Sequence, residues 1–182
     1  VVGEGDWADP DGPNPAMAEI WDPATSTFSP AGTLHAAEAF YSATALPDGR
    51  VLVVGGCTGH SCPKEVLASA EVWDPATDTF GRAGTLAEAR SNHTSTLLPD
   101  GRILVIGGLG AGEIVPSPEF WDPTTESFTP TASMALERRF HTATLLSDGR
   151  VLVIGGYVAG VYAPSEAWDP TTESFTPAAS MA

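Results

Sequence analysis

The sequence of 182 residues has very little positive charge. Eight lysine and arginine residues stand against 23 aspartate and glutamate residues, which gives a formal net charge of −15. Nucleic acids and anionic membrane surfaces attract basic proteins, so this composition argues against both as partners. No stretch approaches the roughly 20 apolar residues that a membrane-spanning helix needs. We therefore expect no binding of nucleic acid and no membrane insertion.

Several kinds of catalytic motif are also missing. No Ser-His-Asp arrangement, paired-carboxylate site or phosphate-cradling glycine loop is recognisable in the sequence. Its glycine doublets end apolar runs without opening a helix, so they cannot present a helix N-terminus to a phosphate. No cofactor is evident. These absences favour a binding or structural protein over an enzyme.

The sequence does contain an internal repeat. An apolar run that ends in two glycines occupies residues 51–56, 103–108 and 151–156, and a remnant of it occupies residues 1–3. The doublets are Gly55 and Gly56, Gly107 and Gly108, and Gly155 and Gly156. Each copy is followed by Trp-Asp-Pro, at Trp21, Trp73, Trp121 and Trp168. A fixed period near 50 residues, built from short strands and turns, is typical of propeller blades.

The pattern inside each copy predicts strands and tight turns. In the last copy, residues 141–146 read as an inner strand, the Asp-Gly turn at residues 147–150 as a hairpin, and residues 151–154 as a buried second strand. No segment has a helical period. The predicted fold is therefore all-β, an open arc of three complete four-stranded blades plus a partial blade.

The predicted blade boundaries follow the repeat. Residues 1–31 form the partial first blade, residues 32–83 and 84–132 form two blades, and residues 133–182 form a blade and the start of the next, all within one propeller domain. Closed propellers have about 4–8 blades. We therefore expect either a fragment of a longer chain or a ring completed by other copies.

The double glycine, the later aromatic residue and the closing Thr-Phe segment resemble the kelch repeat. The recurring sequence pattern most resembles that of secreted bacterial kelch-like proteins and that of the propeller of galactose oxidase-like enzymes. The second resemblance implies a copper ion held by two histidines and two tyrosines, with one Tyr-His pair at the start of an inner strand. The matching pairs here are Phe40-Tyr41, Asn92-His93 and Phe140-His141.

None of these pairs places tyrosine before histidine, and the cysteine-linked tyrosine of those enzymes has no counterpart. A role shared between blades explains His93 and His141 more simply: each is expected to bond the backbone or a neighbouring blade, alongside Arg90 and Arg138. The alternative function is part of a copper radical oxidase whose active-site residues lie outside this segment.

Cys57 and Cys62, the two cysteines of the sequence, lie in one variable loop. The leading interpretation is a local disulfide, which implies an oxidising, extracellular or cell-surface location. The rival is a metal site that adds His60, but three ligands within six residues are not a standard zinc spacing, and a fourth ligand is not evident.

The first loop is acidic, with Asp6, Asp9 and Asp11 close together. Calcium prefers several oxygen ligands from a flexible loop, so these residues are weak calcium candidates. They do not follow the spacing of an EF-hand, and a solvated acidic loop is the simpler interpretation. Trp7 in the same loop lies outside the repeat and suits a contact with a sugar or a partner.

The predicted function is recognition through variable loops on one face of the ring. The repeated tryptophans are expected to act as wedges between blades. The loops at residues 5–18, 57–70, 109–118 and 157–165 vary in length, and all connect the same pair of strands. The predicted contact residues are Trp7, His60, Tyr157 and Tyr162. The partner is a protein, a glycan or another copy, since an open arc exposes apolar surface that favours self-association.

Overall fold

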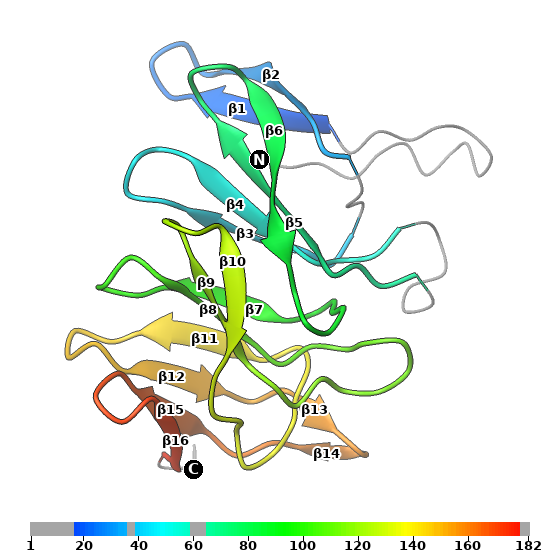
Figure 1. Cartoon of the computed structure of the whole chain (residues 1–182), viewed down its shortest axis with the longest axis vertical. Coiled ribbons are helices and arrows are strands. Elements are labelled where there is room, and N and C mark those ends of the chain that lie inside the picture. The colour runs from blue at the N-terminus through cyan, green and yellow to red at the C-terminus, as the bar shows by residue number, and fades with distance from the viewer. Residues whose placement is uncertain (1–16, 36–38, 59–64, 179–182) are drawn as a thin grey trace.

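The chain forms β-strands and no helices in the part that the structure, a computed structural model, describes. This part comprises residues 17–35, 39–58 and 65–178. The strands form three four-stranded antiparallel sheets, one two-stranded sheet and a small hairpin (Figure 1). This confirms the all-β prediction. Within the same residues, no helix is long and apolar enough to cross a bilayer.

We number the large sheets in chain order. The first sheet pairs β1 (Met17–Asp22) with β2 (Thr27–Thr33). The second sheet contains β3 (Ser42–Ala45), β4 (Val51–Val54), β5 (Ser69–Asp74) and β6 (Thr79–Thr85). The third sheet contains β7 (Thr94–Leu97), β8 (Ile103–Ile106), β9 (Glu119–Asp122) and β10 (Ser127–Pro130). The fourth sheet contains β11 (Thr142–Leu145), β12 (Val151–Ile154), β15 (Glu166–Asp169) and β16 (Ser174–Pro177).

The small hairpin lies inside the last variable loop. It pairs β13 (Tyr157–Val158) with β14 (Val161–Tyr162). Its two turn residues, Ala159 and Gly160, both have positive φ angles, 45° and 90°. This is the conformation that a two-residue hairpin turn requires, because its twist matches that of the flanking strands.

The repeat in the sequence is a repeat in strand register. The first apolar residue of each second strand faces the repeated tryptophan of the third strand. The pairs are Val51 with Trp73, Ile103 with Trp121, and Val151 with Trp168. Each of the three complete copies therefore builds the same four-stranded unit.

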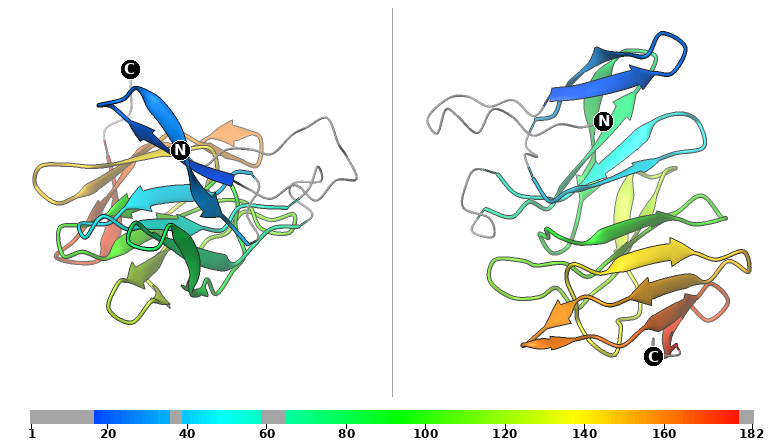
Figure 2. Two further views of the ribbon diagram at one scale, coloured as in Figure 1. Left: turned by 90° about the horizontal axis from the view of Figure 1, so that it is seen from above. Right: turned by 180° about the vertical axis from the view of Figure 1, so that it is seen from behind.

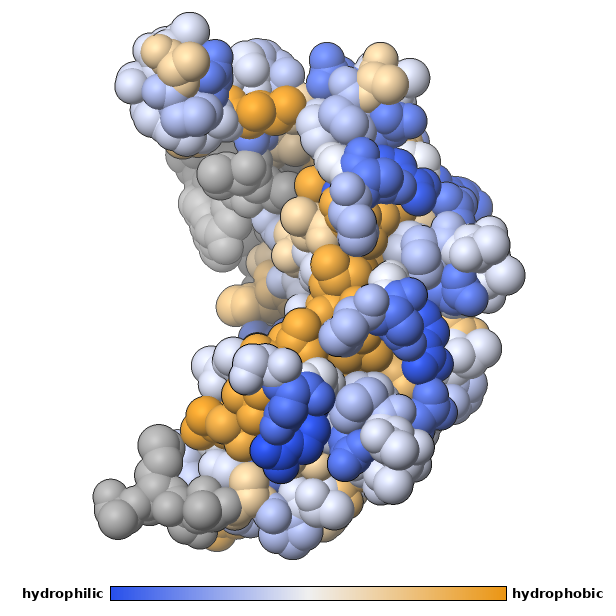
Figure 3. All heavy atoms as spheres, turned by 90° about the vertical axis from the view of Figure 1, so that its left-hand side faces the viewer, coloured by the Kyte–Doolittle hydropathy of each residue, from blue (hydrophilic) through white to orange (hydrophobic). Residues whose placement is uncertain are grey.

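The sheets pack face to face through their second and third strands. Leu52 and Val54 of the second sheet share a buried cluster with Ile103, Val105 and Trp121 of the third sheet. An equivalent cluster joins the third sheet to the fourth. The described part is a crescent, and hydrophobic side chains form a band that follows its curve (Figure 3).

The four repeated tryptophans differ in burial. Trp121 and Trp168 are fully buried, and the indole N–H of Trp121 donates to the backbone oxygen of Ala83 in the preceding sheet, at 2.8 Å. Trp73 is half-buried. Trp21 is 44% exposed and contacts Phe28 of its own sheet instead. Trp21 stays exposed because, among the described residues, no sheet packs against the side of the first sheet that its ring faces.

Candidate interaction face

The two ends of the sheets carry different kinds of connection. The Asp-Gly turns between first and second strands lie at one end (left in Figure 1), and the variable connections between second and third strands lie at the other (right). The behind view shows the same division (Figure 2). We call the end with the variable connections the loop face and the opposite end the turn face.

On the turn face, exposed ion pairs link neighbouring sheets. Arg50 contacts Asp48 in its own turn at 2.8 Å and Glu126 of the third sheet at 3.2 Å. Arg102 repeats this with Asp100 at 2.8 Å and Glu173 of the fourth sheet at 2.9 Å. Each arginine therefore reaches the Thr-rich turn of the following sheet.

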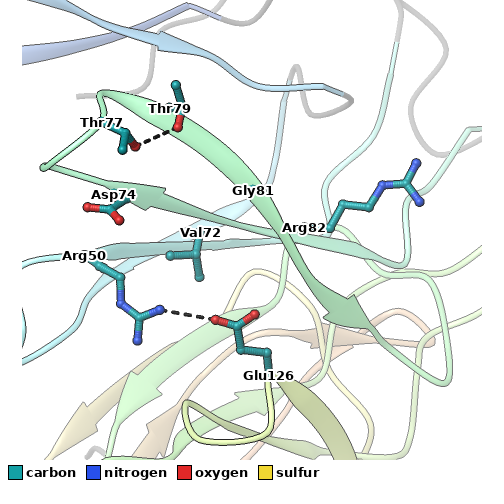
Figure 4. Close-up of a pocket in the computed structure, with 8 residues that line it drawn as sticks. All are labelled: Arg50, Val72, Asp74, Thr77, Thr79, Gly81, Arg82 and Glu126. Carbon is teal, nitrogen blue, oxygen red and sulfur yellow. Dashed lines mark hydrogen bonds and ion pairs between the residues drawn. The ribbon is translucent and has the colours of Figure 1, made fainter.

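A polar pocket of about 240 Å³ lies beside the first of these links (Figure 4). Arg50 and Glu126 face one another across it, whereas Arg82 points away. Thr77 and Thr79 bond to one another at its rim, at 2.8 Å. Arg50 and Glu126 neutralise one another at this pocket, and sequence reasoning did not single it out.

The glycine doublets anchor the loop face to the next sheet. The N–H of Gly108, the second glycine of its doublet, donates to the backbone oxygen of Arg138 at 2.9 Å. A Cβ on the preceding Gly107 would lie 2.3 Å from that oxygen and 2.9 Å from the His141 ring. Gly107 also has a φ of 61°. Glycine is required here both by the backbone conformation and by the close approach of the next sheet.

Buried arginines hold the same region from the inside. The Arg90 guanidinium donates to a Glu119 carboxylate oxygen at 2.6 Å, and both side chains are buried. Arg138 makes the same pair with Glu166 and also donates to the backbone oxygen of Pro164 at 2.6 Å. Burial lowers the pKa of the Arg90 guanidinium, and the charge of Glu119 opposes this shift.

His93 and His141 connect adjacent sheets. The Nε2 atom of His93 lies 2.8 Å from the Ser42 hydroxyl, and that of His141 lies 2.9 Å from the Thr94 hydroxyl. Burial, and next the charge of Arg90, lowers the pKa of His93 to about 3. Burial, and next the charge of Arg138, lowers the pKa of His141 to about 4. Both imidazoles are therefore neutral near pH 7 and act as links between sheets.

The structure brings the two predicted tyrosines together. Tyr157 and Tyr162 face one another across the hairpin, with ring centroids 6.1 Å apart and planes at 73°. Tyr162 is 86% exposed and Tyr157 is 38% exposed. A backbone bridge to Arg139, with Tyr157 N–H to Arg139 O at 2.9 Å, anchors the base of the hairpin. The hairpin thus holds two aromatic side chains on the loop face.

Phe140 adds a third exposed ring, which the sequence reasoning did not identify as a contact residue. It is 61% exposed, and the Arg139 guanidinium lies 5.2 Å from its ring centroid. Its φ is 58°, in a region that non-glycine residues rarely adopt. Its backbone N–H donates to Asn92 O at 3.2 Å, and Asn92 N–H donates to Phe40 O at 3.0 Å. These bonds between sheets stabilise the unusual backbone.

The remaining predicted residues are only partly covered. Cys57 is buried, bridges Ala39 and Val66 through its backbone, and is disulfide-bonded. Its predicted partner Cys62 lies outside the described residues, so the pairing stays a prediction. The candidates Trp7, His60, Asp6, Asp9 and Asp11 also lie outside the described residues. Within the described part, no group of three His, Cys, Asp or Glu side chains is arranged to hold a metal ion.

One family comparison bears on this architecture. Residues 40–85 match the kelch motif. This range spans the whole of the second sheet, and the third and fourth sheets repeat its sequence pattern and strand order. The motif and the all-β architecture together support a propeller of the kelch type. No curated protein matches the chain.

Proposed function

We propose that this protein is a binding module that recognises a protein partner through its loop face. The main observation behind this proposal is a group of three exposed aromatic side chains. Tyr157 and Tyr162 lie on an anchored hairpin, and Phe140 lies on the neighbouring loop. Tyrosine side chains are enriched among the residues that dominate protein interfaces, because they bury a large area at low entropic cost. Kelch repeats in general mediate protein interactions, which supports the same assignment.

The ring geometry favours a protein over a glycan. Sugars stack on flat aromatic faces, whereas the planes of Tyr157 and Tyr162 stand at 73° to one another. Such a pair forms a ridge that suits insertion into a complementary protein surface. The Arg139 guanidinium next to Phe140 adds a positive group to this ridge in an acidic protein.

The proposal includes a location outside the cell. The oxidised state of Cys57 supports it, since disulfides persist in oxidising compartments. Intact mass with and without reduction, measured on protein from its natural source, tests this part.

Photo-crosslinking tests the loop face as the binding surface. A photoreactive amino acid replaces Tyr162 in one variant, and a matched variant carries it at Ser147, which is exposed on the turn face. We expect one protein from an extract of the source organism to couple at position 162 and not at position 147. That protein, once purified, should bind the unmodified chain and lose at least about tenfold in affinity with Tyr162→Ser. Coupling that does not depend on position, or unchanged affinity in Tyr162→Ser, contradicts the proposal.

A further inference from the structure

We propose that the polar pocket on the turn face binds one ring of a neutral sugar. The pocket has a volume of about 240 Å³ and is lined by residues of the second sheet and by Glu126 of the third (Figure 4). It lies at the opposite end of the sheets from the loop face, so this inference does not depend on the function proposed above.

The pocket lies where the second sheet departs from the repeat. Strand register places Val72 of the second sheet at the position that Phe120 occupies in the third. In the third sheet, the Arg102 guanidinium lies 4.1 Å from the centre of the Phe120 ring, so the ring fills the space beside that arginine. Arg50, the equivalent of Arg102, has the smaller Val72 beside it instead (Figure 4). The exchange of phenylalanine for valine therefore leaves room next to Arg50.

Gly81 enlarges this room without serving the backbone. It faces Val72 across the β5–β6 pair, where the other sheets carry a hydroxyl residue, namely Ser29, Thr129 and Thr176. Its φ lies outside the left-handed region, and a Cβ at this position would meet nothing within 4 Å. Neither conformation nor packing requires glycine here. A glycine inside a strand often marks a place where a ligand approaches the backbone closely.

The charges around the pocket suit a ligand without net charge. Two arginines, Arg50 and Arg82, and two acids, Asp74 and Glu126, line it, so their formal charges cancel. Arg50 and Glu126 contact one another at 3.2 Å, and the Arg82 guanidinium points away (Figure 4). An anion in the pocket would lie beside two carboxylates, and a cation would lie beside the Arg50 guanidinium. Like charges in contact oppose both kinds of ligand.

The hydrogen-bonding groups suit hydroxyls. Carboxylates only accept hydrogen bonds, guanidinium groups only donate them, and threonine hydroxyls do both. Within the described residues, the Asp74 carboxylate accepts a hydrogen bond from Ala76 N–H at 2.8 Å and pairs with no cation. Thr77 and Thr79 bond to one another at the rim, and each hydroxyl keeps capacity for a further bond. Neighbouring hydroxyls of a sugar ring both donate and accept, so they match this mixture of groups.

The volume limits the size of the ligand. Pockets that enclose drug-sized molecules measure roughly 300–1,000 Å³. The volume of about 240 Å³ lies below that range. It suits a single sugar ring, and a longer glycan would place one ring in the pocket and extend into solvent.

Saturation-transfer NMR of the whole chain with free sugars tests this inference. The neutral probes are glucose, galactose, mannose and N-acetylglucosamine, and the charged counterparts are glucosamine and glucuronate. We expect saturable binding of at least one neutral sugar and weaker binding of both charged sugars, because the lining charges cancel.

A Gly81→Thr variant tests where the sugar binds. It restores the residue of the third and fourth sheets, and the added side chain takes up space in the pocket. Affinity for the sugar should fall at least about tenfold, while the temperature of unfolding stays the same or rises because threonine favours strands more than glycine does. Glu126→Gln should weaken binding at least about threefold, as expected when a charged hydrogen-bond acceptor is lost. The matched control is Glu173→Gln, at the equivalent position of the fourth sheet, which should bind the sugar like the wild type.

Three results would overturn the inference. The first is that none of the four neutral sugars binds. The second is that a neutral sugar binds the Gly81→Thr variant as tightly as the wild type, since the sugar would then occupy another surface. The third is that glucosamine or glucuronate binds more tightly than every neutral sugar, since the pocket would then select a charge.

Discussion

The Arg90 guanidinium lies 2.6 Å from a Glu119 carboxylate oxygen, and neither side chain has appreciable contact with solvent. The other Glu119 oxygen accepts a hydrogen bond from the Ala87 backbone N–H at 2.9 Å. This relationship ties the segment that enters the third sheet to the third strand of that sheet. It recurs in the fourth sheet between Arg138, Glu166 and Ala135. The buried pair is thus a repeated internal support of the loop face.

Breaking this pair is expected to be costly. Arg90→Met leaves the Glu119 carboxylate buried without its cation, and such an uncompensated charge lowers the free energy of unfolding by about 3–5 kcal/mol. The matched control is Arg150→Ala, which removes an exposed ion pair with Asp148 and should cost far less, as is usual for surface pairs. Chemical denaturation measures both variants. Equal losses in the two would show that burial does not set the strength of the Arg90 pair.

The glycine doublets allow backbone strain to be separated from a steric clash. Gly107 and Gly155 have similar φ angles, 61° and 65°. A Cβ at Gly107 would collide with Arg138 O, whereas a Cβ at Gly155 would meet nothing within 4 Å. Gly155→Ala should therefore cost about 1–2 kcal/mol of stability from the backbone alone, and Gly107→Ala clearly more. Thermal unfolding that ranks the two variants equally would contradict the close approach of the sheets.

Stability should fall as pH falls from about 6.5 towards 4. His93 and His141 have folded pKa values of about 3 and 4, below the ordinary value of 6.5. In this window the unfolded chain binds protons that the folded chain does not, so acid favours unfolding. Each histidine contributes a loss of roughly 2 kcal/mol between pH 7 and pH 5. His141→Gln should flatten the dependence of the unfolding free energy on pH. An unchanged slope would show that His141 is protonated in the folded state.

The disulfide prediction has a direct test. The unreduced protein should be lighter than the reduced protein by the mass of two hydrogens, because Cys57 and Cys62 are the chain's two cysteines. A Cys57→Ser variant should show no change on reduction. Equal masses for the unreduced and reduced wild-type chain would remove the main support for an extracellular location.

Local sequence pattern was enough to predict the sheets. The Asp-Gly turns, the apolar second strands and the tryptophan spacing each specify a short segment, and the structure forms strands at residues 142–145 and 151–154 where the last copy predicts them. The choice of Tyr157 and Tyr162 also followed from local sequence, since both stand in a variable loop. Their pairing across a hairpin rests on the turn at Ala159 and Gly160, which we did not identify beforehand.

Features that join distant segments were harder to predict. Glu119 lies 29 residues from Arg90 in sequence, so nothing local identifies it as the buried partner. The exposure of Trp21 depends on what packs against the first sheet, and its sequence motif is the same as that of the buried Trp121. Phe140 was overlooked as a contact residue because its exposure results from its backbone bonds to the neighbouring sheet.

The affinity of a purified partner for two matched variants tests the loop face most directly. One variant carries Tyr157→Ser and Tyr162→Ser on the loop face, and the other carries Asp100→Ser and Arg102→Ser on the turn face. The account predicts that the loop-face variant loses at least about tenfold in affinity while the turn-face variant binds like the wild type. The opposite ranking, with the turn-face variant impaired and the loop-face variant unaffected, would contradict recognition through the loop face.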